Sequence, residues 1–271
     1  MPYRSGGTYP FTVSLSKKNA GLEKRLTELL GIGRYGNKRS LDESIWDAVD
    51  TISSYLVAFG EVFLEIVHEE EDKPNVTSKS LVFLPLGKII RVFGSYVQVV
   101  PIKNWKREEK KFYIIPANKI WHIKLPRKLG TPRRHRKLVK KLSLLSESTP
   151  SFVLTNDILG NSMKYDFVNR HHNKDIAVEQ ITSGWGSIRS LGQIKGTTEY
   201  YYIANILQLN YSQALLREHI LSEINELLRR LEVKNSIKVD GLVSSTEIMK
   251  TIRRLHKGEI GFTEALKSVK D

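Results

Sequence analysis

The chain contains no cysteine. This absence excludes a disulfide framework, a cysteine-ligated zinc site and a thiol nucleophile, and it fits a reducing compartment. Long apolar runs are also missing, because none approaches the roughly 18 residues of a membrane-spanning helix. The first residues, MPYRSGGTYPF, lack the apolar segment of a signal peptide. We therefore expect a chain that does not cross a membrane.

Acidic residues are absent from one long window. Lys110–Ser146 contains twelve Lys and Arg and no Asp or Glu. The whole chain has 43 basic and 29 acidic residues, and outside this window the counts are 31 and 29. Nearly all of the net charge of +14 is therefore local. Such a window favours contact with a polyanion over a role in solubility alone. Nucleic acid, an acidic membrane face and an acidic protein all stay open as partners.

The composition and the first half of the chain indicate a folded protein with helices and strands. A length of 271 residues and a hydrophobic fraction of 40% suffice for one large domain or two modest ones. Ser40 and Glu43 form a capping box, and apolar residues follow at helical spacing. We therefore predict an amphipathic helix from Leu41 to about Phe59, ended by Gly60. The β-rich runs over residues 60–123 predict an antiparallel sheet against which this helix packs.

The second half of the chain reads as mostly helical. Pro132 suits a first helical position, which predicts a short basic helix over residues 133–146. Residues 148–196 are weakly patterned, with one predicted strand at SFVLT. Neither Pro nor Gly interrupts residues 199–231, so we predict a helix roughly 50 Å long. The tail reads as two short helices, separated at Gly258 and Gly261.

No motif in the chain supports catalysis, a metal or a cofactor. The G-x-G-x-x-G match at Gly31–Gly36 follows a helical pattern instead of a strand, so we interpret it as a turn between helices. His171 and His172 are adjacent and lack a partner at metal-ligand spacing. The acidic run over residues 69–72 fits a solvated hairpin turn, and no G-x-S-x-G frames a serine. We expect a protein that is not an enzyme, with no cofactor and no metal.

Two groups of aromatic residues have alternative interpretations. Tyr200, Tyr201 and Tyr202 stand at the start of the long predicted helix, and Trp185 lies between two glycines. Aromatic side chains of this kind stack on bases in proteins that bind single strands. Packing in the core is the more common role on a long helix, and we favour it here.

The order of the segments resembles the portal proteins of tailed bacteriophages. The helix that ends in a Gly before an apolar strand corresponds to Leu56–Ile66, and the Leu-Pro strand that follows corresponds to Phe83–Ile90. The Trp-His phrase before the stem corresponds to Ile115–Ile123, and the C-terminal helix-Gly-Ile phrase to Glu247–Ala265. The long helix around Gln213–Ile220 suits the element that crosses the ring wall in that family.

The resemblance implies an α+β fold in three parts. Residues 1–125 would form a wing-like body of helix plus antiparallel sheet. Residues 126–196 would form a basic stem helix and a small clip, and residues 197–271 a long helix followed by a C-terminal helical pair. Since portal chains are usually longer, the resemblance also implies a reduced clip and crown.

The resemblance implies a structural function. Portal subunits form a ring, usually dodecameric, at one capsid vertex, through which a separate terminase ATPase drives double-stranded DNA. The implied partners are capsid protein, terminase, head–tail connector proteins and further copies of the chain, with no membrane. The implied location is the virion, and the host cytoplasm during assembly. The alternative from a different class is a monomeric or dimeric basic nucleic-acid-binding protein without enzymatic activity.

The residues expected to carry this function fall into two groups. The first is a set of cations expected to contact DNA or an acidic partner surface: Lys124, Arg127, Lys128, Arg133, Arg134, Arg136, Lys137, Lys140 and Lys141. The second lies on the apolar stripe of the long helix and is expected at the subunit interface: Ile206, Leu209, Leu216 and Leu227. Three arginines of the first group fall at the helix N-terminus, where the helix dipole disfavours cations. That placement indicates a functional demand for positive charge.

Overall fold

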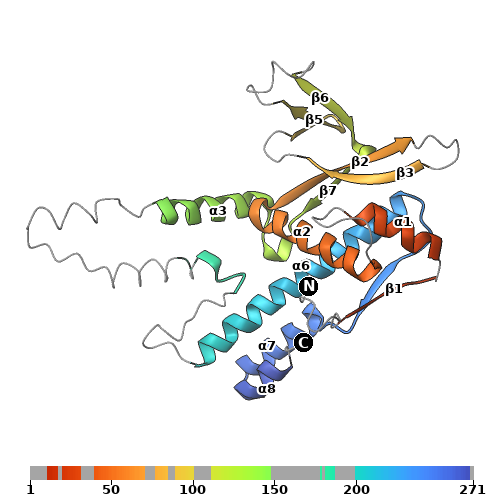
Figure 1. Cartoon of the computed structure of the whole chain (residues 1–271). Coiled ribbons are helices and arrows are strands. Elements are labelled where there is room, and N and C mark those ends of the chain that lie inside the picture. The colour runs from red at the N-terminus through yellow and green to blue at the C-terminus, as the bar shows by residue number, and fades with distance from the viewer. Residues whose placement is uncertain are drawn as a thin grey trace, which may run out of the picture. The chain divides into compact units, whose positions relative to one another are not determined.

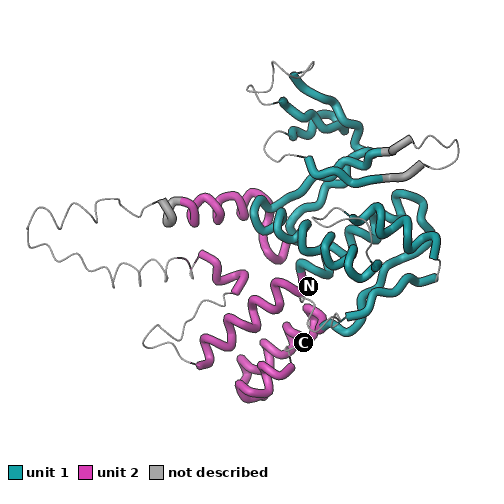
Figure 2. The backbone as a smooth tube through the Cα atoms, viewed as in Figure 1, with its two compact units in different colours: residues 1–126, 216–242, 271 teal, residues 127–215, 243–270 magenta. Residues whose placement is uncertain are grey.

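The structure is a computed structural model that describes residues 11–17, 20–31, 40–70, 77–84, 89–100, 111–147, 178, 181–186 and 199–268. It combines helices with antiparallel sheets, which confirms the α+β prediction (Figure 1). The chain divides into two compact units (Figure 2). Unit 1 comprises residues 1–126, 216–242 and 271, and unit 2 comprises residues 127–215 and 243–270. The long helix α6 (Glu199–Arg230) contributes residues to both.

Helix α2 (Leu41–Phe59) of unit 1 has the predicted bounds, because local hydrogen bonds fix both of its ends. The Ser40 hydroxyl accepts from the Glu43 amide at 3.2 Å, and the Glu43 carboxylate accepts from the Ser40 amide at 3.4 Å. At the other end Gly60 adopts a left-handed conformation with φ of 82°, and its amide donates to the Leu56 carbonyl at 2.8 Å. The predicted capping box and glycine stop are confirmed.

The strands between residues 61 and 124 form two sheets, so the prediction of one sheet over residues 60–123 is wrong in its pairing. Strands β2 (Glu61–Glu70), β3 (Thr77–Phe83) and β7 (Ile120–Lys124) form an antiparallel sheet in the order β3-β2-β7. Strands β4 (Ile89–Val92), β5 (Ser95–Val99) and β6 (Phe112–Pro116) form a separate antiparallel sheet in that order. The 3-10 turn η2 (Ala117–Lys119) separates β6 from β7, and β7 pairs with the distant β2.

Helix α2 and the sheet β4-β5-β6 cover opposite faces of the sheet β3-β2-β7. Leu64 and Phe63 are consecutive in β2, so their side chains point to opposite faces. Phe83 is paired with Leu64 and stacks on Tyr55 of α2 at a centroid distance of 4.6 Å. Phe63 belongs instead to a buried cluster that includes Tyr96 of β5. The order of layers is therefore helix, sheet, sheet.

Three further elements of unit 1 complete this body. Helix α1 (Ala20–Leu30) contacts α2 and β3. Strands β1 (Thr12–Leu15) and β8 (Ile237–Asp240) pair in antiparallel fashion, although more than 200 residues separate them. The sequence patterns did not predict this pair. The Asn225 side chain of α6 fixes β8, since it accepts from the Ile237 amide at 2.8 Å and donates to the Ile237 carbonyl at 3.0 Å.

Unit 2 is helical in its described part. It contains the 3-10 turn η3 (Arg127–Leu129), α3 (Pro132–Glu147), the first half of α6, α7 (Ser245–His256) and α8 (Phe262–Lys267). The predicted basic helix, long helix and helical pair are thus confirmed. Their core is a cluster of buried apolar residues from α6, α7, α8 and the turn between the last two: Ile203, Leu207, Tyr211, Ala214, Ile248, Ile252, Leu255, Ile260 and Ala265. The strand predicted at residues 151–155 and His171–His172 lie outside the described residues.

Candidate polyanion interface

Residues 130–132 set the N-terminus of helix α3. Gly130 has φ of +118°, a conformation that L side chains rarely adopt, and Pro132 is the first helical residue. The Thr131 hydroxyl accepts from the Arg134 amide at 3.3 Å, as an N-cap side chain does. The Thr131 carbonyl accepts from the His135 amide at 2.9 Å, the first helical hydrogen bond. These contacts fix the first turn, and with it the positions of three arginines.

The polar side of α3 presents cations to solvent. Six of its basic residues are exposed: Arg133, Arg134, Arg136, Lys137, Lys140 and Lys141. The other side holds Leu138, Val139 and Leu142, which are half-buried, and His135, which is buried and contacts the Trp185 ring at 5.6 Å. The helix is therefore amphipathic with a cationic outer surface, as predicted.

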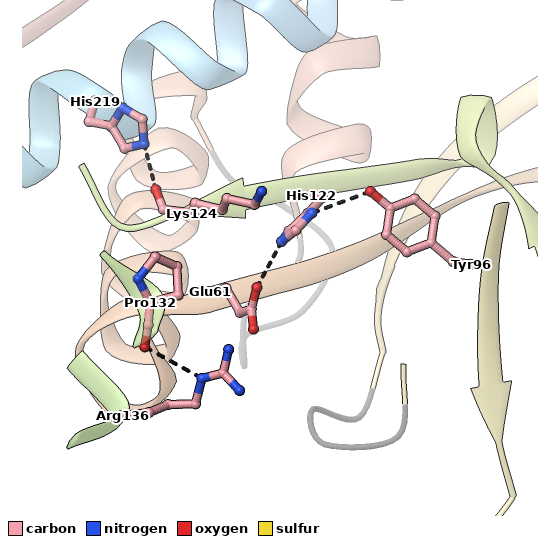
Figure 3. Close-up of polar contacts among 7 residues, drawn as sticks. All are labelled: Glu61, Tyr96, His122, Lys124, Pro132, Arg136 and His219. Carbon is pink, nitrogen blue, oxygen red and sulfur yellow. Dashed lines mark hydrogen bonds and ion pairs between the residues drawn. The ribbon is translucent and has the colours of Figure 1, made fainter. Parts of the chain in front are cut away.

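Five of these six charges are not neutralised by carboxylates of the described residues. Within the described ranges, no ion pair involves Arg133, Arg134, Lys137, Lys140 or Lys141. The Arg136 Nε donates to the Pro132 carbonyl at 3.4 Å, which holds the guanidinium beside the first helical turn (Figure 3). The positive end of the helix dipole and the guanidinium groups of the three arginines therefore lie in the same place. A bound anion would relieve their mutual repulsion.

Two more predicted cations lie just before α3, and one belongs to the other unit. Arg127 and Lys128 are exposed in η3 of unit 2. Lys124 is exposed at the end of β7 in unit 1, where its backbone carbonyl accepts from His219 Nε2 at 2.7 Å (Figure 3). Eight of the nine predicted cations therefore belong to the short η3–α3 segment, which we call the basic segment.

The predicted subunit interface needs a correction. Leu216 is 6% exposed and Leu227 is 0% exposed, so neither side chain offers surface to a neighbouring subunit. The reason is that the apolar face of the second half of α6 is packed inside the protein, where Ile220 and Ile224 are also fully buried. Helical periodicity identified the apolar stripe but not what covers it. Ile206 and Leu209 are half-buried, and their place at an interface stays a prediction.

The interpretation of the three tyrosines as core residues is wrong. Tyr200, Tyr201 and Tyr202 are 40%, 43% and 37% exposed. They stand at the first turn of α6, where the Tyr200 ring contacts those of His256 and Phe262. Trp185, in contrast, is half-buried beside His135.

A polar group that the sequence patterns missed connects the two sheets of unit 1. His122 of β7 lies between Glu61 of β2 and Tyr96 of β5, with Nε2 at 3.1 Å from the carboxylate and Nδ1 at 3.3 Å from the hydroxyl (Figure 3). Its ring also stacks on the Phe63 ring, with 4.1 Å between the ring centroids. All three polar side chains are thus paired with one another. We assign this group to holding the sheets together.

Two further kinds of feature, metal-ligand clusters and membrane-spanning helices, are absent from the described residues. No three His, Asp or Glu side chains among them converge as metal ligands would. Of the helices that the structure describes, none combines the length and the apolar character needed to cross a membrane.

These features define a class of fold: a layered helix–sheet unit, a helical unit, and one long helix shared by both. No protein-family profile and no curated protein sequence matches the chain. A similar fold occurs in a solved structure described as the neck of an empty GTA particle, computed with C6 symmetry. The alignment covers 96% of this chain and 86% of that chain, with a TM-score of 0.50 and 13% sequence identity. At that identity the likeness concerns the fold.

Proposed function

We propose that this chain is a structural subunit of the head–tail connector region of a tailed-phage-like particle, and specifically a portal subunit. In that role copies of the chain form a ring at one capsid vertex, through which DNA is packaged and ejected. The observation that carries the proposal is the fold shared, over 96% of the chain, with a protein from a particle neck. The order of sequence phrases that resembles portal proteins supports the same role independently of the fold.

The proposed assembly follows from symmetry. Head-to-tail contacts between identical subunits close into a ring when each contact adds the same rotation. The similar structure was computed with C6 symmetry. Rings of six or of twelve copies are both compatible with a sixfold axis, and we propose the dodecamer that is usual among portal proteins. The proposed location is the virion, after assembly in the host cytoplasm.

The basic segment has a defined place in this proposal. Its exposed cations contact a polyanion, either duplex DNA in the channel or an acidic surface of capsid protein, terminase or a connector protein. Contacts with phosphates are sequence-independent and weaken with salt, which suits DNA that must slide. The subunit itself performs no catalysis in this role, and a separate terminase supplies the work of packaging.

Assembly mass is the test that separates this function from the alternative. Purified full-length protein is measured by mass photometry and by negative-stain microscopy, alone and with capsid protein. A portal subunit gives closed rings of six or twelve copies. The alternative, a small nucleic-acid-binding protein favoured by the same basic segment, gives monomers or dimers that bind DNA. Protein that never assembles beyond a dimer contradicts the portal proposal.

A further inference from the structure

The sheet β4-β5-β6 has one face made almost wholly of apolar residues. Side chains that are paired across strands point to the same face, and Val97 is paired with both Ile90 and Ile114. By alternation the same face carries the next pairs on either side. Its members, which we call the outer face, are Ile90, Val92, Ser95, Val97, Val99, Phe112, Ile114 and Pro116. Ser95 is the only polar side chain among them, and none is charged.

The outer face is exposed, because the unit's own core lies on the other side of the sheet. Tyr96 and Ile115 point to that other side and are each 6% exposed in the cluster with Phe63. On the outer face, Ile114 is 65% exposed and Ile90 57%. An antiparallel sheet with one face in water normally alternates apolar and polar residues. Here the water-facing positions are apolar as well.

The exposed apolar surface is large enough for a protein contact. Five of its side chains, Ile90, Val92, Val99, Phe112 and Ile114, are between 38% and 65% exposed. They present on the order of 400–500 Å², taking roughly 150–200 Å² for a large side chain in full exposure. The largest patch on a typical monomer is about 300–600 Å² and is often functional. One side of a standard interface buries about 800 Å².

The hairpin that joins β4 to β5 also indicates a contact with another protein. Phe93 and Gly94 form its two-residue loop with φ of 43° and 82°. Such a loop favours Asn or Gly at both central positions, because L side chains rarely adopt positive φ. Phe93 is 104% exposed, so its ring gains nothing from burial within its own chain. A fully exposed aromatic ring in an unfavourable conformation fits a residue that packs against a partner.

Charge favours a second copy of this chain as the partner. The net charge of +14 makes copies repel one another wherever their cations face. The outer face carries none of that charge, so a contact there brings no cations of this face against the neighbouring copy. A ring contact also needs two different surfaces on each subunit, since each copy meets one neighbour with each.

Unit 1 has a second group of exposed apolar residues. It lies at the C-terminal end of α2, where Val57 and Phe59 are each 47% exposed and Ala58 is exposed between them. Helix α2 covers one face of the sheet β3-β2-β7, and the sheet β4-β5-β6 covers the other. We propose that the outer face of one copy packs on the α2 end of the next copy, a contact that rests on the proposed ring.

Thiol cross-linking tests this contact, because the chain has no cysteine of its own. Full-length Ile114→Cys, Ala58→Cys and the double variant are assembled and treated with a short flexible bis-maleimide. We expect the double variant to give a ladder of covalent oligomers on a denaturing gel. Each single variant stays monomeric, and an equal mixture of the two gives dimers only. A dimer from Ile114→Cys alone, or rings that give no ladder, would overturn the proposal.

A second measurement tests the same contact without a cross-linker. The double variant Phe112→Asp/Ile114→Asp places charges on the outer face without disturbing the inner core. We expect at least a tenfold loss of rings by mass photometry, with an unchanged circular dichroism spectrum. Thr246→Asp, at an exposed position of α7, adds charge elsewhere and keeps the rings. If wild type forms rings and the double variant forms them equally well, this contact is wrong while the proposed function stands. If wild type forms none, both fail.

Discussion

At the scale of single residues, Gly186 marks a position where two parts of the backbone come very close together. Gly186 has φ of +77°, and a Cβ at this position would lie 2.2 Å from the Leu209 backbone nitrogen and 2.5 Å from the Asn205 carbonyl oxygen. The neighbouring Gly184 carbonyl accepts from the Gln208 side chain at 2.9 Å. Residues 184–186 therefore lie directly against the backbone of α6, and only glycine fits at 186.

The two glycines provide a matched pair of substitutions. Gly186→Ala introduces both a strained φ and a clash with backbone that cannot move aside, so we expect a loss of stability greater than about 1 kcal/mol. Gly184→Ala meets nothing within 4 Å and has no positive φ, so its expected effect is below about 0.5 kcal/mol. Urea unfolding of the two variants beside wild type measures the difference. Equal stabilities would show that this segment does not pack as described.

A second residue, Glu247, makes the stability of unit 2 depend on pH. The Glu247 carboxylate accepts from the Ser244 amide at 2.9 Å and from its hydroxyl at 2.7 Å. These two hydrogen bonds hold the pKa of Glu247 below its usual value. Because the pKa is lower in the folded state, the stabilisation is present above the unfolded pKa and is lost as pH falls through the folded one.

The substitution Glu247→Gln removes the carboxylate that titrates, and with it this dependence of stability on pH. We expect the variant to melt at a lower temperature than wild type near neutral pH. The difference should shrink as the pH is lowered from about 7 to about 3, where the carboxylate becomes protonated. Thermal melts of both proteins across this range are the measurement. A difference that grows towards acid would contradict the assigned hydrogen bonds.

At the scale of elements, local signals were sufficient for helices and insufficient for strand pairing. The capping box at Ser40 and the helix start at Pro132 depend on nearby residues, and their helices fall within a residue or so of the predicted bounds. Strand pairing depends on residues far apart in sequence. The four-residue strands β1 and β8 and the division into two sheets were missed for that reason. The burial of Leu227 and the exposure of Tyr201 likewise depend on what packs against α6.

Charge reversal in α3 separates stability from function. Arg133, Arg134 and Arg136 are exposed in the first helical turns, where acids are favoured by about 0.3–1 kcal/mol each. The triple change of these arginines to Glu should therefore leave the fold intact or slightly more stable. It should weaken binding to duplex DNA and make that binding less dependent on salt, since fewer counterions are released.

Two measurements on the same protein check this prediction. Melting temperature reports the fold, and DNA affinity between about 50 and 200 mM salt reports the charge contacts. The control reverses Lys250, an exposed cation of α7 outside the basic segment. Unfolding of the triple variant would mean that the arginines are structural. Sequence-specific binding that resists salt would contradict a sliding contact with phosphates.

At the scale of the whole molecule, sequence and structure contribute different parts of the functional argument. The local excess of cations was readable from composition, and the structure places eight of them in one short segment. The apolar outer face was not readable, because it is assembled from three strands whose pairing the patterns did not predict. A contact surface of this kind becomes visible only when the register of the sheet is known.

Ring formation should be measurable as a dependence of stability on concentration. Only folded chains enter a ring, so assembly stabilises the folded state by mass action. We expect the melting temperature of wild type to rise as protein concentration is raised from about 0.1 to about 10 µM. The variant Phe112→Asp/Ile114→Asp should melt at the same temperature throughout, since it has lost the contact while keeping its core. Differential scanning fluorimetry across this range is the measurement. A wild-type melting temperature that does not change with concentration would show that folding and assembly are not coupled, contrary to a ring built through the outer face.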